Sequence, residues 1–226
     1  MVEFTAEIAG YTIAIRALFP ETKEIFKDYL TEEQPSVTIE SSEKLIVAER
    51  QLLKEADVEE KLPVDDFTDA KIESNFLYRE VAERLSEYKT VLFPGSAVAV
   101  DGEGDLFVAP SGTGKSTHSR LWLANVPDSH LLNDDNPIVR LCNDGRVWVF
   151  GSPWSGKTPC YINKGVPVGG IVKLSQAPEN RIRRCALPEA YAALYSSISG
   201  LKMNREMYDG LHETMEKTVV TVPFYH

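Results

Sequence analysis

The chain has 226 residues, of which 43% are hydrophobic and 26% are charged, a composition typical of a globular protein with its own core. Its formal net charge of -10 argues against general nucleic-acid binding and gives no support for binding to an anionic membrane. No apolar run approaches the length of a transmembrane helix, and the first residues lack the basic region of a signal peptide, so we expect a cytoplasmic protein. The three cysteines have no metal-binding spacing and are expected to be reduced, buried thiols: Cys142, Cys160 and Cys185.

The first 65 residues predict a small N-terminal appendage of strands and helices. The sequence contains no motif that assigns it a role, so partner recognition, completion of the sheet and oligomerisation all stay open. Its predicted elements, in chain order, are residues 4–18 (two strands paired around Ala9-Gly10), 22–30 (a short helix or turn), 35–41 (a strand) and 43–56 (a helix, or a strand over 45–49).

An acidic segment, residues 58–69, is interrupted by Pro63 and predicts a boundary. We therefore divide the chain into an appendage, residues 1–65, and a core, residues 66–226.

The core is predicted to mix hairpins with helices. Its predicted elements, in chain order, are a helix at 72–88 with Phe76, Val81 and Leu85 on one face, a hairpin at 96–110 joined by residues 101–104, a helix at 116–125, a strand at 130–133, a hairpin at 138–150 that turns at 143–145, a strand at 168–176, helices at 188–198 and 204–217, and a final strand at 218–225.

The segment APSGTGKST, residues 109–117, nearly matches the phosphate-binding pattern G-x-x-x-x-G-K-[ST], with Ala109 in place of the first glycine. Glycines in such a loop turn successive N–H groups toward phosphate oxygens, and the helix that follows adds its positive end. Lys115 is expected to reach the β- and γ-phosphates of ATP, and the Ser116 hydroxyl to bind Mg²⁺. The predicted nucleotide-binding residues are Ser111, Gly112, Thr113, Gly114, Lys115, Ser116 and Thr117.

This loop follows a tight hairpin, so the strands before it are antiparallel. The sequence therefore predicts an α/β fold with a mixed sheet (α+β in character), and not the parallel sheet of common nucleotide-binding folds.

Two adjacent carboxylates, Asp134 and Asp135, follow the strand predicted at 130–133. Phosphoryl transfer needs a group that accepts the hydroxyl proton and oxygen ligands for Mg²⁺. We assign Asp134 as the base and Asp135 as the metal ligand, with the reverse assignment open. The alternative is a structural Asp-Asp-Asn-Pro turn.

Three further side chains are candidate site residues, and each also has a purely structural interpretation. Lys157 is predicted to neutralise phosphate charge, or to be a solvated loop lysine. Arg120 would contact the acceptor or its phosphate, or form a salt bridge on the helix surface. Trp154 would stack on a ligand, although packing is favoured. His118 is expected to pack rather than reach the phosphates.

The segments LFVAPSGTGKSTHSRLW (106–122), LLNDDNPIV (131–139) and GSPWSGK (151–157) resemble the HPr serine kinase/phosphorylase family, over roughly residues 90–175. That family shares its nucleotide-binding core with the ATP-dependent phosphoenolpyruvate carboxykinases. The resemblance implies a P-loop core with β-hairpins flanking the Walker A loop. It also implies that one of Asp134 and Asp135 acts as base, and it is nearest to small HPr-kinase-like proteins that phosphorylate a serine of a precursor peptide.

One position departs from the family. Pro94 stands where the bifunctional enzymes carry a histidine, and proline cannot transfer protons, which argues against phosphorylase activity and against HPr itself as the substrate.

We therefore expect an ATP- and Mg²⁺-dependent kinase that transfers the γ-phosphate to a hydroxyl, most simply of serine, on a peptide, protein or small molecule. The alternatives are a catalytically silent ATP-binding regulatory module and a carboxykinase-like phosphotransferase. We expect no nucleic-acid or membrane partner, and the sequence leaves a homo-oligomer open.

Overall fold

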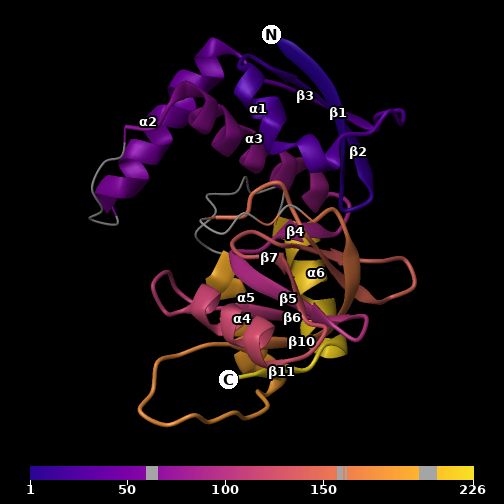
Figure 1. The fold of residues 1–226 in the computed structure, drawn as a ribbon, viewed down its shortest axis with the longest axis vertical. Coiled ribbons are helices and arrows are strands. Elements are labelled where there is room, and N and C mark those ends of the chain that lie inside the picture. Colours follow the sequence, from indigo (N-terminus) through magenta and orange to yellow (C-terminus); the bar gives the residue numbers. More distant parts are fainter. Residues whose placement is uncertain (60–65, 157–159, 161, 199–207) are drawn as a thin grey trace. The chain divides into compact units, whose positions relative to one another are not determined.

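The computed structural model describes residues 1–59, 66–156, 160, 162–198 and 208–226 (Figure 1). The chain divides into two compact units, Met1–Arg84 and Leu85–His226, and each is described by itself. Helix α3 (Asp69–Ser86) belongs almost wholly to the first unit, so the units divide after Arg84 and not after residue 65, where the sequence predicts the boundary. Within the described segments, no helix is long and apolar enough to cross a membrane.

The described part of the N-terminal unit contains a three-stranded sheet in the order β1-β2-β3. Strands β1 (Val2–Ile8) and β2 (Tyr11–Ala17) form an antiparallel hairpin, which confirms the predicted pairing around Ala9-Gly10. Strand β3 (Val37–Glu40) runs parallel to β2.

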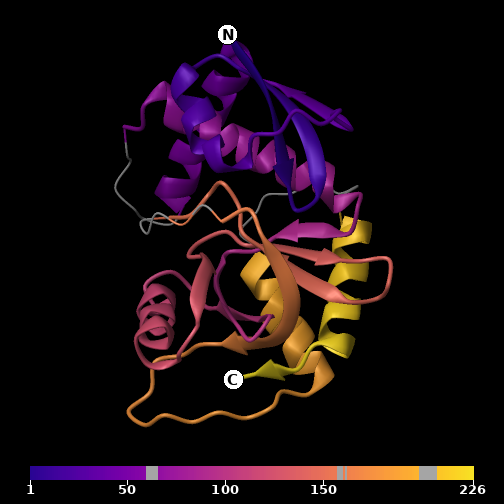
Figure 2. The same ribbon diagram turned by 45° about the vertical axis from the view of Figure 1, so that its right-hand side comes forward.

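The helices of this unit are α1 (Pro20–Ile25), the 3-10 turn η1 (Lys27–Tyr29), α2 (Glu43–Glu59) and α3, and Figures 1 and 2 show them gathered on one side of the sheet. Helix α2 confirms the helical interpretation of residues 43–56 and makes the alternative strand over 45–49 wrong.

A buried carboxylate on α3 joins the elements of this unit. Glu73 is 0% exposed. It accepts hydrogen bonds from the backbone N–H groups of Leu18 (2.6 Å) and Phe19 (3.2 Å). It also accepts from the hydroxyls of Thr22 and Ser41. These donors lie where β2 leads into α1 and where β3 leads into α2, so one side chain fixes both connections to α3.

The C-terminal unit is built on a curled, mixed sheet. Its described strands follow the order β4-β8-β9-β10-β6-β5-β7, with β11 also paired to β10. Their bounds are β4 (Thr90–Leu92), β5 (Gly95–Val100), β6 (Glu103–Val108), β7 (His130–Asn133), β8 (Ile138–Leu141), β9 (Val147–Phe150), β10 (Gly165–Lys173) and β11 (Phe224–Tyr225).

Strand β10 is the centre of this sheet. Its first residues pair antiparallel with β9, and its last residues pair parallel with both β6 and β11. The two hairpins predicted from their turn residues are confirmed as β5-β6 and β8-β9. The mixed α/β architecture expected from the sequence is therefore confirmed at the level of strand directions.

Three helices complete the described C-terminal unit: α4 (Lys115–Asn125), α5 (Leu187–Ile198) and α6 (Tyr208–Thr221). Figure 2 shows α4 and α6 on opposite sides of the strands. Adjacent strand residues alternate between faces. Ser96 and Phe107 face α4, where they meet Ser119 and His118. Alternate residues of β5 and β6 join the core cluster with α5 and α6: Ala97, Ala99, Leu106 and Val108.

The strand predicted over residues 218–225 is wrong for its first half. Helix α6 continues to Thr221, and β11 contains only Phe224–Tyr225. The hydroxyls of Thr214, Thr218 and Thr221 each donate to the carbonyl four residues earlier, which keeps these β-branched residues compatible with a helix.

Candidate functional site

Three strand ends meet at one edge of the sheet. Strand β6 ends at Val108, and Lys173 at the end of β10 pairs with it in parallel. Strand β7 is antiparallel to β5, which is antiparallel to β6, so β7 also ends at this edge, at Asn133. The glycine-rich loop, the Asp134-Asp135 pair and the segment after Lys173 therefore all begin at this edge, with β5 between β6 and β7. Such an edge is where α/β proteins place their ligands.

The glycine-rich loop connects β6 directly to α4 (Figure 1). Gly112 has φ 77° and Gly114 has φ 112°, a conformation that favours glycine. Because a Cβ at either position would meet nothing within 4 Å, backbone conformation and not space requires glycine there. Gly114 is the N-cap of α4 and provides no side-chain cap, so the first amides of the helix have no such acceptor.

Lys115 folds back over this loop. Its Nζ donates to the carbonyl of Ala109 at 2.8 Å and to that of Pro110 at 3.4 Å. The residue that replaces the first glycine of the pattern thus contributes its carbonyl to the loop. Of the predicted nucleotide-binding residues, Ser111, Gly112 and Thr117 are exposed and the others are half-buried: Thr113, Gly114, Lys115 and Ser116.

The two aspartates lie in a turn, because β7 has already ended. Asn133 Oδ1 accepts hydrogen bonds from the backbone N–H groups of Asp135 (2.9 Å) and Asn136 (2.7 Å). The turn alternative is therefore correct for the backbone. It does not remove the functional interpretation, since a turn frees adjacent side chains from the strict alternation of a strand.

Asp134 is connected to the glycine-rich loop through two buried serines. Asp134 is only 7% exposed, and its Oδ1 accepts a hydrogen bond from Ser96 Oγ at 3.0 Å. The Ser96 and Ser119 hydroxyl oxygens are 2.6 Å apart, and because Ser96 gives its one hydrogen to Asp134, Ser119 is the donor of this contact. Ser119 Oγ also lies 3.2 Å from the carbonyl oxygen of Lys115. This chain of contacts fixes the Asp134 carboxylate relative to the first turn of α4.

The segment GSPWSG, residues 151–156, lies against the same turn. Asn133 Nδ2 donates to the carbonyl of Ser152 at 3.2 Å and to its hydroxyl at 3.1 Å. Gly156 has φ 40°, and a Cβ there would lie 2.8 Å from Asp135 Cβ. The structure thus brings Asp135 together with the second glycine-containing segment. Lys157, which follows directly, lies outside the described residues.

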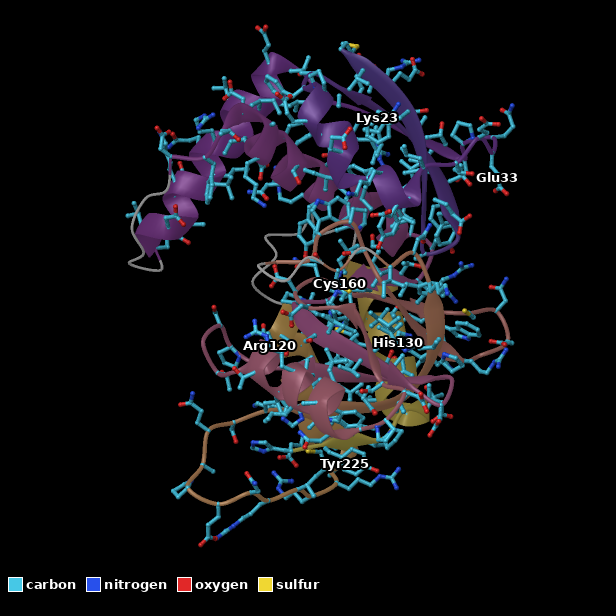
Figure 3. The ribbon with its side chains drawn as sticks, in the orientation of Figure 1. Lys23, Glu33, Arg120, His130, Cys160 and Tyr225 are labelled. Carbon is cyan, nitrogen blue, oxygen red and sulfur yellow. The ribbon has the colours of Figure 1, made fainter. Side chains whose placement is uncertain are left out.

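Two of the candidate contact residues differ in accessibility. The Trp154 side chain is 7% exposed, in agreement with the favoured packing interpretation. Arg120 is exposed on α4, and none of the described carboxylates forms an ion pair with it (Figure 3). The helix-surface salt bridge considered for Arg120 is therefore not formed within the described part of the chain.

His118 packs as expected. Its ring lies edge-on to Phe107 with the ring centroids 4.6 Å apart, and its Nε2 accepts from Trp122 Nε1 at 3.2 Å. Burial lowers the pKa of His118, which favours the neutral ring.

Three residues of this site, Ser96, Ser119 and Asn133, are not among those predicted from the sequence. Ser119 is four residues after Lys115 and therefore on the same side of α4, a spacing that was available as a signal. Asn133 also carries a sequence signal, because an Asn directly before Asp-Asp-Asn is typical of a residue whose side chain accepts hydrogen bonds from the backbone of a turn. Nothing local indicates that Ser96 would meet either of them. No protein-family model matches the chain, and a search of curated proteins finds no match either.

Proposed function

We propose that this chain is an ATP-dependent phosphotransferase that transfers the γ-phosphate to a hydroxyl, most simply a serine hydroxyl, of a peptide, protein or small molecule. The observation that carries the proposal is the buried connection from the Asp134 carboxylate through Ser96 and Ser119 to the first turn of α4. This connection fixes the position of the Asp134 carboxylate, which can accept a proton, relative to the glycine-rich loop, which can bind phosphate.

The loop supports nucleotide binding by its chemistry. It offers backbone amides at a helix N-terminus, where no side chain caps them at Gly114, and one lysine ammonium. In the described structure that ammonium binds loop carbonyls. Phosphate oxygens are stronger acceptors for it because they are charged. We therefore expect Lys115 to exchange the carbonyls of Ala109 and Pro110 for the β- and γ-phosphates.

Asp134 is proposed as the base. Its Oδ1 is held by Ser96, and none of the described groups hydrogen-bonds to Oδ2. In the transfer, the acceptor oxygen bonds to the γ-phosphorus while the bond from that phosphorus to the β-phosphate oxygen breaks. The acceptor proton goes to Asp134, and ADP leaves.

The residues available for Mg²⁺ are hard oxygen donors, the Ser116 hydroxyl and the Asp135 carboxylate, and they fit this ion by type. Among the described residues no three His, Cys, Asp or Glu side chains form a ready metal cluster. Mg²⁺ commonly takes only one or two protein ligands and completes its shell with phosphate oxygens and water. The ion would neutralise phosphate charge, and Asp135 would orient it.

The finer fold assignment, a P-loop core of the HPr kinase and carboxykinase type, is part of this proposal. What supports it is a glycine-rich loop between a hairpin and a helix, in a mixed sheet, with an acidic turn at the same edge. The cytoplasmic location and a homo-oligomeric state are retained as proposals only.

The test is acceptor-dependent ADP release in the presence of Mg²⁺, with a panel of serine-containing peptides and small hydroxy compounds. The product is identified by ³¹P NMR as a phosphate monoester. Asp134→Asn is compared with Asp144→Asn, which changes an exposed aspartate in the β8-β9 turn. Loss of a general base lowers the turnover by roughly 100-fold or more. We expect that loss in Asp134→Asn and near wild-type turnover in Asp144→Asn.

Nucleotide binding is measured separately by calorimetry. Lys115→Ala is expected to lose ATP affinity, and Asp134→Asn to retain it. ATP binding by the wild-type protein without turnover on any acceptor would favour the silent regulatory module. Phosphate transfer that requires oxaloacetate would favour the carboxykinase-like enzyme.

A further inference from the structure

Arg120 is an exposed cation on α4 (Figure 3). None of the described residues forms an ion pair or a hydrogen bond with its side chain. Most of the other described arginines do pair with a carboxylate, and these are Arg16, Arg50, Arg79, Arg146, Arg181 and Arg183. In a chain with a formal net charge of -10, an arginine left outside such pairs is available to bind an anion that the chain does not supply.

The direction in which Arg120 leaves α4 follows from the two residues before it. His118 packs its ring against Phe107 of β6, and Ser119 meets Ser96 of β5. Successive residues of a helix point about 100° apart, so the direction turns from β6 to β5 and then toward the next strand of the sheet. That strand is β7. Arg120 therefore lies on the β7 flank of α4.

The β7 flank of α4 is the side from which an acceptor would approach. Asp134, the proposed base, directly follows β7, and α4 contacts β7. Ser116, the proposed Mg²⁺ ligand, precedes Arg120 by four residues and is therefore on the same side of the helix. An acceptor whose hydroxyl reaches Asp134 thus lies beside the flank that carries Arg120.

This side of the site is otherwise acidic. Asp134 and Asp135 are adjacent, and a bound triphosphate would add more negative charge. An anionic acceptor would be repelled by these groups unless a cation nearby offset the repulsion. Arginine suits a carboxylate, because its planar guanidinium donates two parallel N–H bonds to the two carboxylate oxygens. A neutral acceptor would need no such group.

We propose that Arg120 binds a carboxylate of the acceptor, and that the acceptor is therefore an anionic hydroxy compound. The chemistry required is a hydroxyl with a carboxylate close to it, which an acidic side chain beside the serine of a peptide or a small hydroxy acid can supply. This inference rests on the proposed function, because it presumes transfer to a hydroxyl near Asp134. It adds the substrate class, since charged acceptors are preferred over neutral acceptors of the same shape.

The test is the kinetics of acceptor-dependent ADP release by the full chain, with two pairs of acceptors that differ in charge. One pair is a serine peptide with an aspartate beside the serine and the same peptide with an asparagine there. The other pair is glycerate and glycerol. The wild type is expected to have the higher kcat/KM for the charged member. The pair with the larger difference shows whether the carboxylate belongs to a peptide or to a small molecule.

Arg120→Ala removes the cation and, because Arg120 is exposed, is expected to leave the fold intact. We expect it to raise the KM for the charged acceptor roughly tenfold, the size of a hydrogen bond to a charged group, with kcat within about twofold of wild type. The KM for the neutral acceptor and the calorimetric affinity for ATP should not change. Thermal unfolding of the variant is measured alongside.

Charge reversal provides a second variant with a matched control. Arg120→Glu should invert the preference, so that a peptide with a lysine beside the serine becomes a better substrate than the aspartate peptide. Lys217→Glu changes the net charge by the same amount at an exposed residue of α6, on the other side of the strands from α4 (Figure 2). It should keep the wild-type preference, whereas a long-range field would act on both variants alike.

The outcomes separate this inference from the proposed function. Equal kcat/KM values of the wild type for charged and neutral acceptors would overturn the inference and leave the proposed function standing. An equal fall of kcat for both acceptors in Arg120→Ala would mean that the arginine contacts the transferred phosphate, and weaker ATP binding would mean that it contacts the nucleotide. Either result overturns the inference. If the wild type transfers phosphate to no acceptor, the proposed function itself fails, and the inference fails with it.

Discussion

Replacing Glu73 should destabilise the N-terminal unit more than replacing any other carboxylate of α3. Glu73 is fully buried and receives four hydrogen bonds, two from backbone N–H groups and two from hydroxyls. Glu73→Gln keeps the shape of the side chain but leaves one acceptor oxygen and turns an NH₂ group toward existing donors.

The magnitude follows from those contacts. A hydrogen bond to a charged acceptor contributes about 1.5–3 kcal/mol, and the contributions of four bonds to one group are not additive. The folded state also bears the cost of burying the carboxylate, which offsets part of the gain. We therefore expect Glu73→Gln to lower the free energy of unfolding by roughly 3–5 kcal/mol, a large share of the stability of an ordinary domain.

The assay is urea unfolding followed by far-ultraviolet circular dichroism. Tryptophan fluorescence would not report on this unit, because the tryptophans, Trp122, Trp148 and Trp154, all lie in the C-terminal unit. Glu80→Ala, on the same helix, is the control. Burial raises the pKa of Glu80, so its charge is not a source of stability, and we expect a change within about 0.5 kcal/mol. If Glu73→Gln left the free energy of unfolding unchanged, the reasoning would be refuted.

Three further changes test other parts of the molecule. Burial raises the pKa of the Cys160 thiol to about 11, so mass spectrometry should find it unalkylated in the folded protein at pH 8 and alkylated after denaturation; equal alkylation in both states would contradict its burial. Gly156→Ala should displace Asp135 and lower turnover more than the control Gly145→Ala. Both glycines have a positive φ (40° at Gly156 and 79° at Gly145), but no atom lies within 4 Å of a Cβ added at Gly145. Equal effects of the two variants on kcat would mean that backbone strain alone, and not displacement of Asp135, causes the loss. Burial raises the folded-state pKa of Glu49 above its unfolded value, so its contribution is fully present below the unfolded pKa and is lost as pH rises through the folded pKa. Relative to Glu49→Gln, the wild type should thus lose stability in chemical denaturation as the pH rises above 4.5, the ordinary value for glutamate, and a pH-independent difference would contradict the assigned cause.

Sequence alone predicts the elements whose signals are local. The β5-β6 hairpin is predictable because Asp101-Gly102 is a turn sequence between two apolar runs, and the β8-β9 hairpin for the same reason. The end of α6 is not predictable from the sequence, because residues 218–222 are β-branched and favour a strand by propensity. Their hydroxyl contacts to helix carbonyls and the burial of Val219 and Val222 decide otherwise.

The candidate site also has one part that the sequence shows and another that only the folded chain shows. The glycine-rich loop and the Asp134-Asp135 pair are visible as short motifs, and each motif is continuous in the chain. The connection between them is not visible, because Ser96 and Ser119 meet only when β5 pairs with β6 and α4 folds back over both.

The shared edge of β6, β7 and β10 has a consequence for how such a protein can diversify. Each of the three segments that leave this edge starts from a strand whose position is set by backbone pairing within the sheet. Residues in one segment can therefore be exchanged without moving the starting points of the other two. The side chains near Asp134 and those after Lys173 can thus change independently of each other and of the glycine-rich loop between them.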